Sequence, residues 1–288
     1  MPEKAKPSDK SQKTQTDYYY YLETQEQDTG TQYPPVNPVN WQSGTILLNQ
    51  YQIERLLGTG GASKVFLVKE IHTGELIAMK VPTVSFAIGS LRQRLFFREI
   101  RTWMDLPFHP NLTTCYTFKN VNERIAIFAE YVDGKSLDEH VIKQSMTDLV
   151  DILDTGIQMA WGLEVAHRAG IIHQDVKPAN ILVNSKGIVK ITDFGLARAH
   201  EIAQSYNAVS LNSKELSRNN PSLSRGVMTP SYCSLEQKTR SKLDFRTDIW
   251  SFGLTLLTLF TGPTWWDTGS AGKDILKKYL EVAPRDPY

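Results

Sequence analysis

The chain has 288 residues, of which 41% are hydrophobic and 22% are charged, so its composition is that of an ordinary globular protein with a sizeable core. Its 32 basic and 31 acidic side chains give a formal net charge of +1, which argues against nucleic acid or an anionic membrane surface as a partner. The two cysteines, Cys115 and Cys233, match no metal-ligand spacing and indicate free thiols in a reducing cytoplasm.

Targeting peptides and membrane spans are not expected from the sequence. Residues 1–20 are polar and lack the apolar stretch of a signal peptide. The longest apolar run, Ile249–Phe260, is too short to cross a bilayer and contains Ser251 and Gly253. We therefore expect a buried core helix there, no membrane segment in this chain, and a cytoplasmic location.

The expected elements divide the chain into a polar tail, a β-rich first half and a helical second half. Residues 1–45 are poor in branched aliphatic side chains, so we expect a disordered tail that cannot offset its ordering entropy. After the tail, the pattern predicts strands at 51–57, 65–68, 76–81, 116–118 and 125–131, a helix at 91–106, and short strands at 181–183 and 188–192 among later helices. This order predicts an α+β protein with two lobes.

A glycine-rich loop separates the first two expected strands. Gly58, Gly60 and Gly61 lack Cβ atoms, so the backbone N–H groups of this loop could approach the phosphates of a ligand closely. A plain hairpin turn is the alternative reading of the same residues. A Rossmann dinucleotide site is disfavoured because a strand, and not a helix, follows the glycines.

Lys80 on the third expected strand has a candidate partner in the expected helix. Leu95, Glu99 and Trp103 fall at helical spacing and share a face that is otherwise apolar. A lysine among apolar neighbours needs an anion, because burying its charge alone is costly. The pattern therefore favours a Lys80–Glu99 ion pair, and a solvated Glu99 is the alternative.

Polar side chains gather around the expected hairpin at 181–192. Asp175 and Asn180 precede its first strand, and Asp193 follows its second strand. Because a hairpin returns its second strand beside its first, Asp193 should arrive near Asn180. A few oxygen ligands suit a Mg²⁺ ion that substrate phosphates also hold.

Six segments in this order resemble the motifs of a eukaryotic-type (Hanks-type) protein kinase domain. They are Leu57–Val65, Ala78–Lys80, Arg98–Ile100, His173–Asn180, Asp193–Gly195 and Asp248–Gly253. The resemblance implies a bilobal protein-kinase-like fold at 51–288, with an antiparallel β N-lobe and one helix at about 51–129. A mainly helical C-lobe at about 134–288 follows, which is incomplete at its C-terminal end compared with the family.

The resemblance also implies ATP and Mg²⁺ as cofactors and assigns residues to them. Residues expected to cover the ATP phosphates are Leu57, Gly58, Thr59, Gly60, Gly61, Ala62, Ser63, Lys64 and Val65. Lys80, held by Glu99, is expected to bind the α/β-phosphates, while Glu130 and Val132 are expected to bind adenine. Asn180 and Asp193 are expected to hold Mg²⁺. Asp175 is the expected catalytic base, and Lys177 is expected to bind the transferring phosphoryl group.

The substrate class follows from the same resemblance. Lys177 stands two residues after Asp175, as in serine/threonine kinases, and Thr229–Glu236 is similar to a segment of bacterial members, in which the threonine contacts the catalytic aspartate. The chain is thus expected to be a bacterial kinase that phosphorylates serine and threonine in proteins. Two alternatives are a pseudokinase scaffold that binds nucleotide or partners without transfer, and a small-molecule phosphotransferase.

Departures from the family pattern concern regulation and the C-terminal end. Gln174 replaces an arginine that binds a phosphate on the activation segment, so we expect activity with little dependence on that phosphate. The stretch between Asp193 and Glu236 is long and rich in serine, which makes several serines candidate autophosphorylation sites. The family's arginine partner for Glu236 is missing unless Arg285 takes its place.

Overall fold

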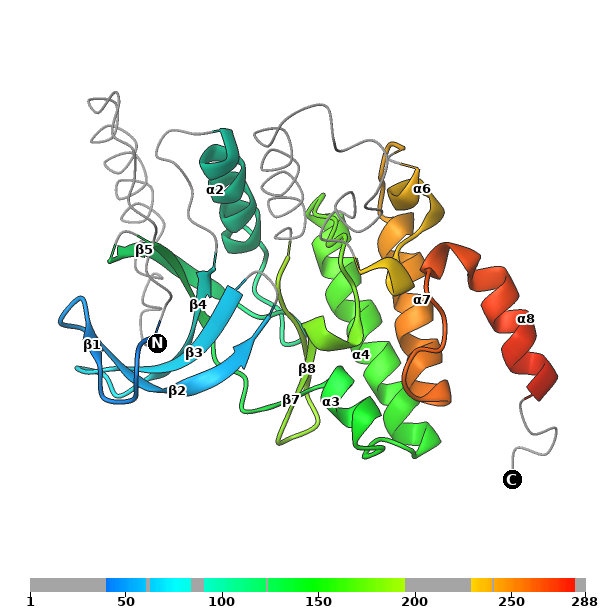
Figure 1. The fold of residues 1–288 in the computed structure, drawn as a ribbon, viewed down its shortest axis with the longest axis horizontal. Coiled ribbons are helices and arrows are strands. Elements are labelled where there is room, and N and C mark those ends of the chain that lie inside the picture. Colours follow the sequence, from blue (N-terminus) through cyan, green and yellow to red (C-terminus); the bar gives the residue numbers. More distant parts are fainter. Residues whose placement is uncertain are drawn as a thin grey trace, which may run out of the picture.

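The computed structural model describes residues 40–60, 63–83, 91–122, 124–194, 229–239 and 241–282. For residues 91–95, 99 and 282 it describes the backbone alone. Within these ranges most strands gather in one lobe and most helices in the other (Figure 1), which is the expected α+β arrangement.

The N-lobe is a six-stranded antiparallel sheet with strand order β1-β2-β3-β4-β6-β5. Its strands are β1 (Ile46–Leu47), β2 (Tyr51–Thr59), β3 (Ser63–Glu70), β4 (Leu76–Pro82), β5 (Cys115–Val121) and β6 (Arg124–Glu130). Helix α2 (Leu91–Met104) packs against this sheet, where the rings of Phe97 and Phe118 lie 5.1 Å apart. Each predicted strand of this lobe is present, with ends that differ by a few residues.

The packed region begins before the expected end of the polar tail. The ring of Trp41 lies 5.6 Å from that of Phe66, and the N–H of Gly44 donates to the carbonyl of Ile53 at 2.8 Å. Residues 40–45 therefore pack beside the N-lobe sheet, and the end of the polar tail lies before residue 45, where the sequence pattern places it. An aromatic side chain that covers a sheet gives a short polar segment enough apolar burial to be ordered.

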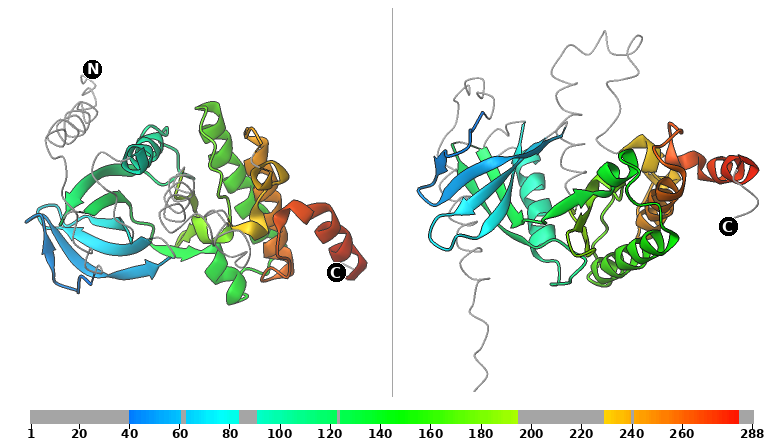
Figure 2. Two further views of the ribbon diagram at one scale, coloured as in Figure 1. Left: turned by 45° about the horizontal axis from the view of Figure 1, so that its top comes forward. Right: turned by 90° about the horizontal axis from the view of Figure 1, so that it is seen from below.

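The C-lobe combines a small sheet with the helices. Its elements are β7 (Gly134–Ser136), α3 (Leu137–Ile142), α4 (Leu149–Arg168), η1 (Pro178–Asn180), β8 (Ile181–Asn184), β9 (Val189–Ile191), η2 (Pro230–Tyr232), α6 (Leu235–Lys238), α7 (Arg246–Thr261), η3 (Gly269–Ala271) and α8 (Gly272–Val282). Strands β7 and β8 lie between the N-lobe sheet and helices α3 and α4, and α8 extends at the far end (Figures 1 and 2).

Helix α4 is the long central helix of this lobe. The Asp148 side chain accepts a hydrogen bond from the N–H of Val150 at 2.7 Å and so caps the first turn. Ile152, Met159 and Leu163 recur at helical spacing and are buried, which explains why this segment packs as a helix. The face so buried points toward strand β9 and the interior of the molecule.

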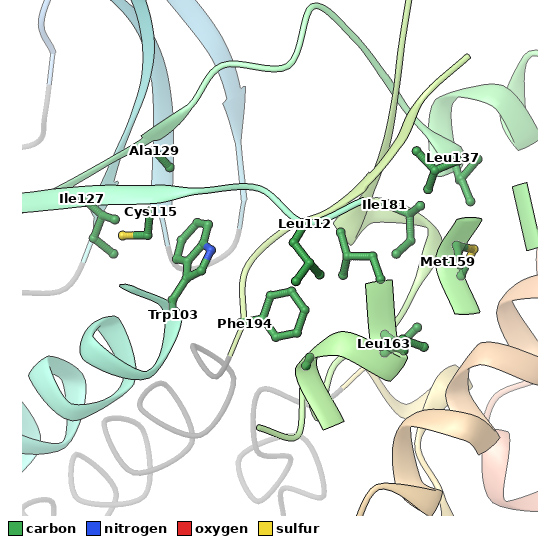
Figure 3. Packing of buried hydrophobic residues seen from close by; sticks show 14 of the residues in the cluster. Trp103, Leu112, Cys115, Ile127, Ala129, Leu137, Met159, Leu163, Ile181 and Phe194 are labelled. Atoms are coloured by element: carbon green, nitrogen blue, oxygen red, sulfur yellow. The ribbon is translucent and has the colours of Figure 1, made fainter. Parts of the chain in front are cut away.

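One hydrophobic core runs from the N-lobe into the C-lobe. Figure 3 shows Phe194 beside Leu112, between Trp103 of α2 and Leu163 of α4. Phe194 is fully buried. Because Phe194 directly follows Asp193, packing of the phenyl ring fixes the backbone from which that carboxylate projects.

Helix α7 contains the long apolar run of the sequence. Leu254 and Leu259 are buried, but Ile249 and Phe260 remain 50% and 45% exposed. The expectation of a buried core helix is therefore right for only one face of α7. Among the described residues, no helix combines the length and apolar content needed to cross a bilayer.

A glycine of helix α4 provides a test of how closely this helix packs against β9, and a glycine of α7 is the control. An ideal Cβ on Gly162 would lie 2.9 Å from both the Asn111 carbonyl oxygen and Ile191 Cδ1, whereas one on Gly253 of α7 would meet no atom within 4 Å. We expect Gly162→Ala to lower the free energy of unfolding by about 1–3 kcal/mol because of overpacking. Gly253→Ala should raise it by about 0.5–1 kcal/mol, since alanine favours helix. Urea denaturation of both variants is the measurement, and equal effects of one sign would contradict the packing.

Candidate active site

The segment that carries Asp175 is held in place by a buried carboxylate of helix α7. Asp248 is fully buried and accepts hydrogen bonds from the N–H groups of His173 and Gln174, each at 2.8 Å. Its Oδ2 also lies 2.8 Å from Nε2 of His167. Hydrogen bonds to a charged acceptor each stabilise by about 1.5–3 kcal/mol, so this one side chain fixes the backbone before Asp175.

Gln174 occupies a backbone conformation that few residues adopt. Its φ is 69°, in the left-handed region. Its N–H is bound by Asp248, and its carbonyl accepts from Nε2 of Gln237 at 2.7 Å. The two contacts hold this strained turn from opposite sides, and neither involves a phosphate group.

His173 connects this turn to the strand end that carries Asp193. Its Nδ1 accepts from the N–H of Asp175 at 3.2 Å, so Nε2 carries the proton and donates to the Thr192 carbonyl at 2.8 Å. The imidazole is fully buried, and its centroid lies 4.5 Å from that of Phe194. The imidazole of His173 therefore links the segment of Asp175 to that of Asp193.

Three side chains, those of Lys177, Asn180 and Thr229, meet around Asp175. Its Oδ2 lies 2.7 Å from Nζ of Lys177 and accepts from Nδ2 of Asn180 at 3.0 Å. The Lys177 ammonium also donates to the Thr229 hydroxyl at 2.7 Å, and that hydroxyl donates to Asp175 Oδ1 at 3.4 Å. Thr229 thus makes the contact expected from the resemblance. Among contacts with the described residues, Oδ1 makes only this long one and is the less engaged oxygen.

Asp193 arrives beside Asn180 because β8 and β9 pair as a hairpin. The strands are antiparallel, and the N–H of Thr192 donates to the Asn180 carbonyl at 3.0 Å. This convergence was predicted from the sequence. Asp193 itself has φ 67°, a left-handed conformation that turns the chain away after the strand.

Lys80 of β4 reaches across to Asp193. Its Nζ lies 2.6 Å from Asp193 Oδ2, with both side chains largely buried. Burial raises the pKa of the Asp193 carboxyl, but the charge and hydrogen bond of Lys80 and the charges of neighbouring groups such as Lys177 together outweigh it, so the pKa lies below its ordinary value. The site thus holds an ionised carboxylate at neutral pH.

The Lys80–Asp193 pair was not among the contacts expected from the sequence. The expected partner, Glu99, lies on α2, but its side chain is outside the described part of the molecule. The Lys80–Glu99 pair therefore stays a prediction. A signal for the observed pair was available, because both charges were expected to face the same triphosphate and attract each other at short range.

The glycine loop lies at the turn between β2 and β3. Gly58 pairs with Val65 and Thr59 with Lys64, and the N–H of Gly60 donates to the Ser63 carbonyl at 2.8 Å. Residues 61 and 62, which include two of the predicted phosphate contacts, lie outside the described residues. A Cβ on Gly58 would meet no atom within 4 Å, so protein packing alone does not require glycine there.

The segment that joins the lobes begins at the end of β6. Glu130 is the last residue of that strand, and Val132 lies two residues later and is buried. Ala129 pairs with Ala78 across β6 and β4, so small side chains line this part of the sheet. Both predicted adenine contacts thus lie in the connection between the two sheets.

The oxygen ligands available for a metal are few. Within the described ranges, no group of three or more His, Cys, Asp or Glu side chains could hold a metal ion. Asn180 uses its Nδ2 on the Asp175 carbonyl and carboxylate, which leaves Oδ1 as its acceptor, and Asp193 has a second oxygen besides the one at Lys80. Such a set fits Mg²⁺, which needs few protein ligands when phosphates supply others.

Some residues singled out from the sequence lie outside the described ranges. They are Gly195, the serines between Asp193 and Thr229, and Arg285. The network of Asp248 and Gln237 was not predicted. Its sequence signal is weak, because nothing near position 173 indicates which distant carboxylate will reach it.

Known proteins resemble this chain in sequence and in fold. The family model described as "Protein kinase domain" matches residues 51–284. A probable serine/threonine-protein kinase of Clostridium perfringens is 32% identical over 219 residues, covering 76% of this chain and 30% of that protein. The serine/threonine-protein kinase PrkC of Bacillus subtilis is 29% identical over 239 residues, covering 83% of this chain and 34% of that protein. The chain thus spans about a third of the length of these relatives.

A solved structure supports the fold independently. The crystal structure of the Mycobacterium tuberculosis PknI kinase domain matches with a TM-score of 0.60 at 24% identity, covering 79% of this chain and 78% of that one. At this identity the likeness concerns the fold alone. Together with the family match over residues 51–284 and the polar cluster around Asp175, it confirms what the motifs predicted: the chain belongs to the protein kinase domain family.

Proposed function

We propose that this domain transfers the γ-phosphoryl group of ATP to serine and threonine hydroxyls of proteins. The observation that supports the proposal most is the cluster at Asp175, in which Lys177 and Thr229 surround one carboxylate beside Asn180 and Asp193. Relatives from the bacteria Clostridium perfringens, Lactococcus lactis and Bacillus subtilis are named serine/threonine-protein kinases or probable ones. ATP as co-substrate and two free thiols, Cys115 and Cys233, favour a cytoplasmic location for the domain.

Asp175 is the proposed catalytic base. As the substrate hydroxyl oxygen bonds to the γ-phosphorus, the bond from that phosphorus to the β–γ bridging oxygen breaks and ADP leaves. The hydroxyl proton passes to the Asp175 carboxylate. Oδ1 is the oxygen suited to accept it, since Oδ2 is already bound by Lys177 and Asn180. Lys177, held at 2.7 Å from Asp175, is placed to stabilise negative charge on the transferring group.

Nucleotide binding is proposed for the space between the glycine loop and the polar cluster. Backbone groups at Gly58 and Gly60 approach the phosphates, and Glu130 and Val132 offer backbone groups to adenine. Lys80 then exchanges its contact with Asp193 for the α/β-phosphates, which frees the Asp193 carboxylate. Mg²⁺, when bound, neutralises charge on the β- and γ-phosphates, and Asn180 and Asp193 are the residues that would hold it.

Replacement of the proposed base tests the chemical step. Asp175→Asn keeps the size of the side chain but removes its proton affinity, so we expect a loss of phosphoryl transfer of about 10²–10⁴-fold. Affinity for ATP should change little. Transfer of labelled phosphate to a generic protein substrate, together with nucleotide binding, is the measurement. Asp151→Asn, at an exposed position of α4, is the matched control. Equal transfer by the Asp175 variant and the wild type would refute the role.

A second replacement tests the proposed metal ligand. Asp193→Asn removes a carboxylate whose lowered pKa keeps it ionised at neutral pH. We expect the wild type to bind ATP more tightly with Mg²⁺ than with EDTA, and the variant to lose most of that difference. Calorimetric titration under both conditions measures it. A Mg²⁺ effect of wild-type size in the variant would exclude Asp193 as a ligand.

Dephosphorylation tests the consequence of Gln174. A neutral amide cannot form the bidentate charge-assisted contact that an arginine makes with phosphate. The turn at Gln174 is instead held by Asp248 and Gln237, so we expect phosphatase-treated protein to retain most of its activity. The measurement is the rate of phosphoryl transfer before and after phosphatase treatment, with mass spectrometry to verify that the phosphate has been removed. A large loss of activity contradicts the hypothesis.

A further inference from the structure

A second ion pair crosses between the lobes, away from the polar cluster. Nζ of Lys190 on β9 lies 2.5 Å from Oε1 of Glu130 at the end of β6. The two side chains are only 11% and 23% exposed. Strand β6 belongs to the N-lobe sheet and β9 to the C-lobe sheet, so this pair joins the two sheets directly.

The Glu130 side chain is fixed on both of its oxygens. Oε2 accepts from the N–H of Thr114 at 3.2 Å, while the Glu130 N–H donates to the Thr114 carbonyl at 2.8 Å. The carboxylate therefore bridges an ammonium from the C-lobe and a backbone amide at the start of β5. Its position is set by both neighbours together.

The segment before β5 is itself bound to β9. The N–H of Ile191 donates to the Asn111 carbonyl and the N–H of Thr113 donates to the Ile191 carbonyl, each at 2.9 Å. The Lys190 ammonium also lies 3.5 Å from the Leu112 carbonyl. Glu130 is thus tied to β9 by two routes, one through Lys190 and one through Thr114.

These contacts place Glu130 at the point where the chain leaves the N-lobe. Residues 131–133 lead from β6 to β7, and their backbone direction depends on how the end of β6 is held. Removal of one member of a largely buried ion pair leaves its partner uncompensated, so the remaining charge tends to move toward water. Such a movement at Glu130 would displace the segment proposed to contact adenine.

We propose that Lys190 is a positioning residue for nucleotide binding, which acts through its ion pair with Glu130 and has no contact with the nucleotide itself. The inference rests on the proposed function, because it assigns the Glu130–Val132 segment to adenine. A merely structural ion pair would contribute to stability and leave the nucleotide affinity of the folded protein unchanged. Nucleotide affinity is therefore the quantity that separates the two roles.

The test compares ADP binding by variants of this pair. Lys190→Met should raise the Kd for ADP by about 2- to 30-fold, the range by which residues without ligand contact alter binding. KM for ATP should rise in parallel, while kcat changes less. Lys190→Arg, which keeps the charge, should stay near the wild type. Lys186→Met, at an exposed position in the β8–β9 turn, is the matched control and should bind as the wild type does.

A double-mutant cycle shows whether Lys190 acts through Glu130. Glu130→Gln keeps an acceptor for the Thr114 N–H but loses the charge, so Lys190→Met should add less than a twofold change in Kd in that background. Independent effects of the two substitutions would overturn the proposed route. Thermal denaturation verifies that each variant is folded, and Lys190→Gln replaces Lys190→Met in the comparison if the latter does not fold.

The outcomes also separate this inference from the proposed function. If the wild type binds ADP and Lys190→Met binds it equally well, the positioning role is refuted and the kinase assignment stands. If the folded wild type binds no nucleotide, the proposed function fails and this inference fails with it. Weaker binding by Lys190→Met alone, with Lys190→Arg and Lys186→Met unchanged, supports the inference.

Discussion

The buried carboxylate of Asp248 is the interaction on which the rest of the site depends. It binds the N–H groups of His173 and Gln174 from the first turn of α7, so a helix some seventy positions later in the sequence determines where Asp175 lies. A buried carboxylate is stable only when several donors surround it, and His167 supplies a third. The arrangement therefore couples folding of α7 to the order of the segment that carries the proposed base.

Packing and charge act together at the second carboxylate. Phe194 is anchored in the core that both lobes share, and His173 binds the Thr192 carbonyl just before it. These contacts restrict the backbone position of Asp193, and the Lys80 ammonium forms an ion pair with its carboxylate. A metal-bound triphosphate would separate Lys80 from Asp193, since the ammonium would gain the phosphates as partners and the carboxylate would gain the metal ion. The contact between Lys80 and Asp193 thus holds both groups in place.

The two lobes are joined by polar contacts as well as by the core. Glu130 meets Lys190 and Thr114, while Asn111 and Thr113 bind strand β9. Hydrogen bonds and ion pairs between largely buried polar groups fix a defined geometry, because an unpaired partner would be costly. The end of β6 and the segment before β5 are therefore held to the C-lobe at several points near the residues proposed to contact adenine.

The sequence by itself determined the family, the positions of the main N-lobe strands along the chain and the return of Asp193 to Asn180, because these depend on local patterns and on a hairpin of a dozen residues. It did not indicate Asp248 at the Asp175 loop, the Lys80–Asp193 contact, Gln237 at Gln174, or Lys190 at Glu130. It also placed the end of the polar tail too late and treated α7 as buried all round. The contacts of Asp248, Lys80, Gln237 and Lys190 join residues that lie far apart in the chain, so only the tertiary packing of their elements decided which charges and donors would meet.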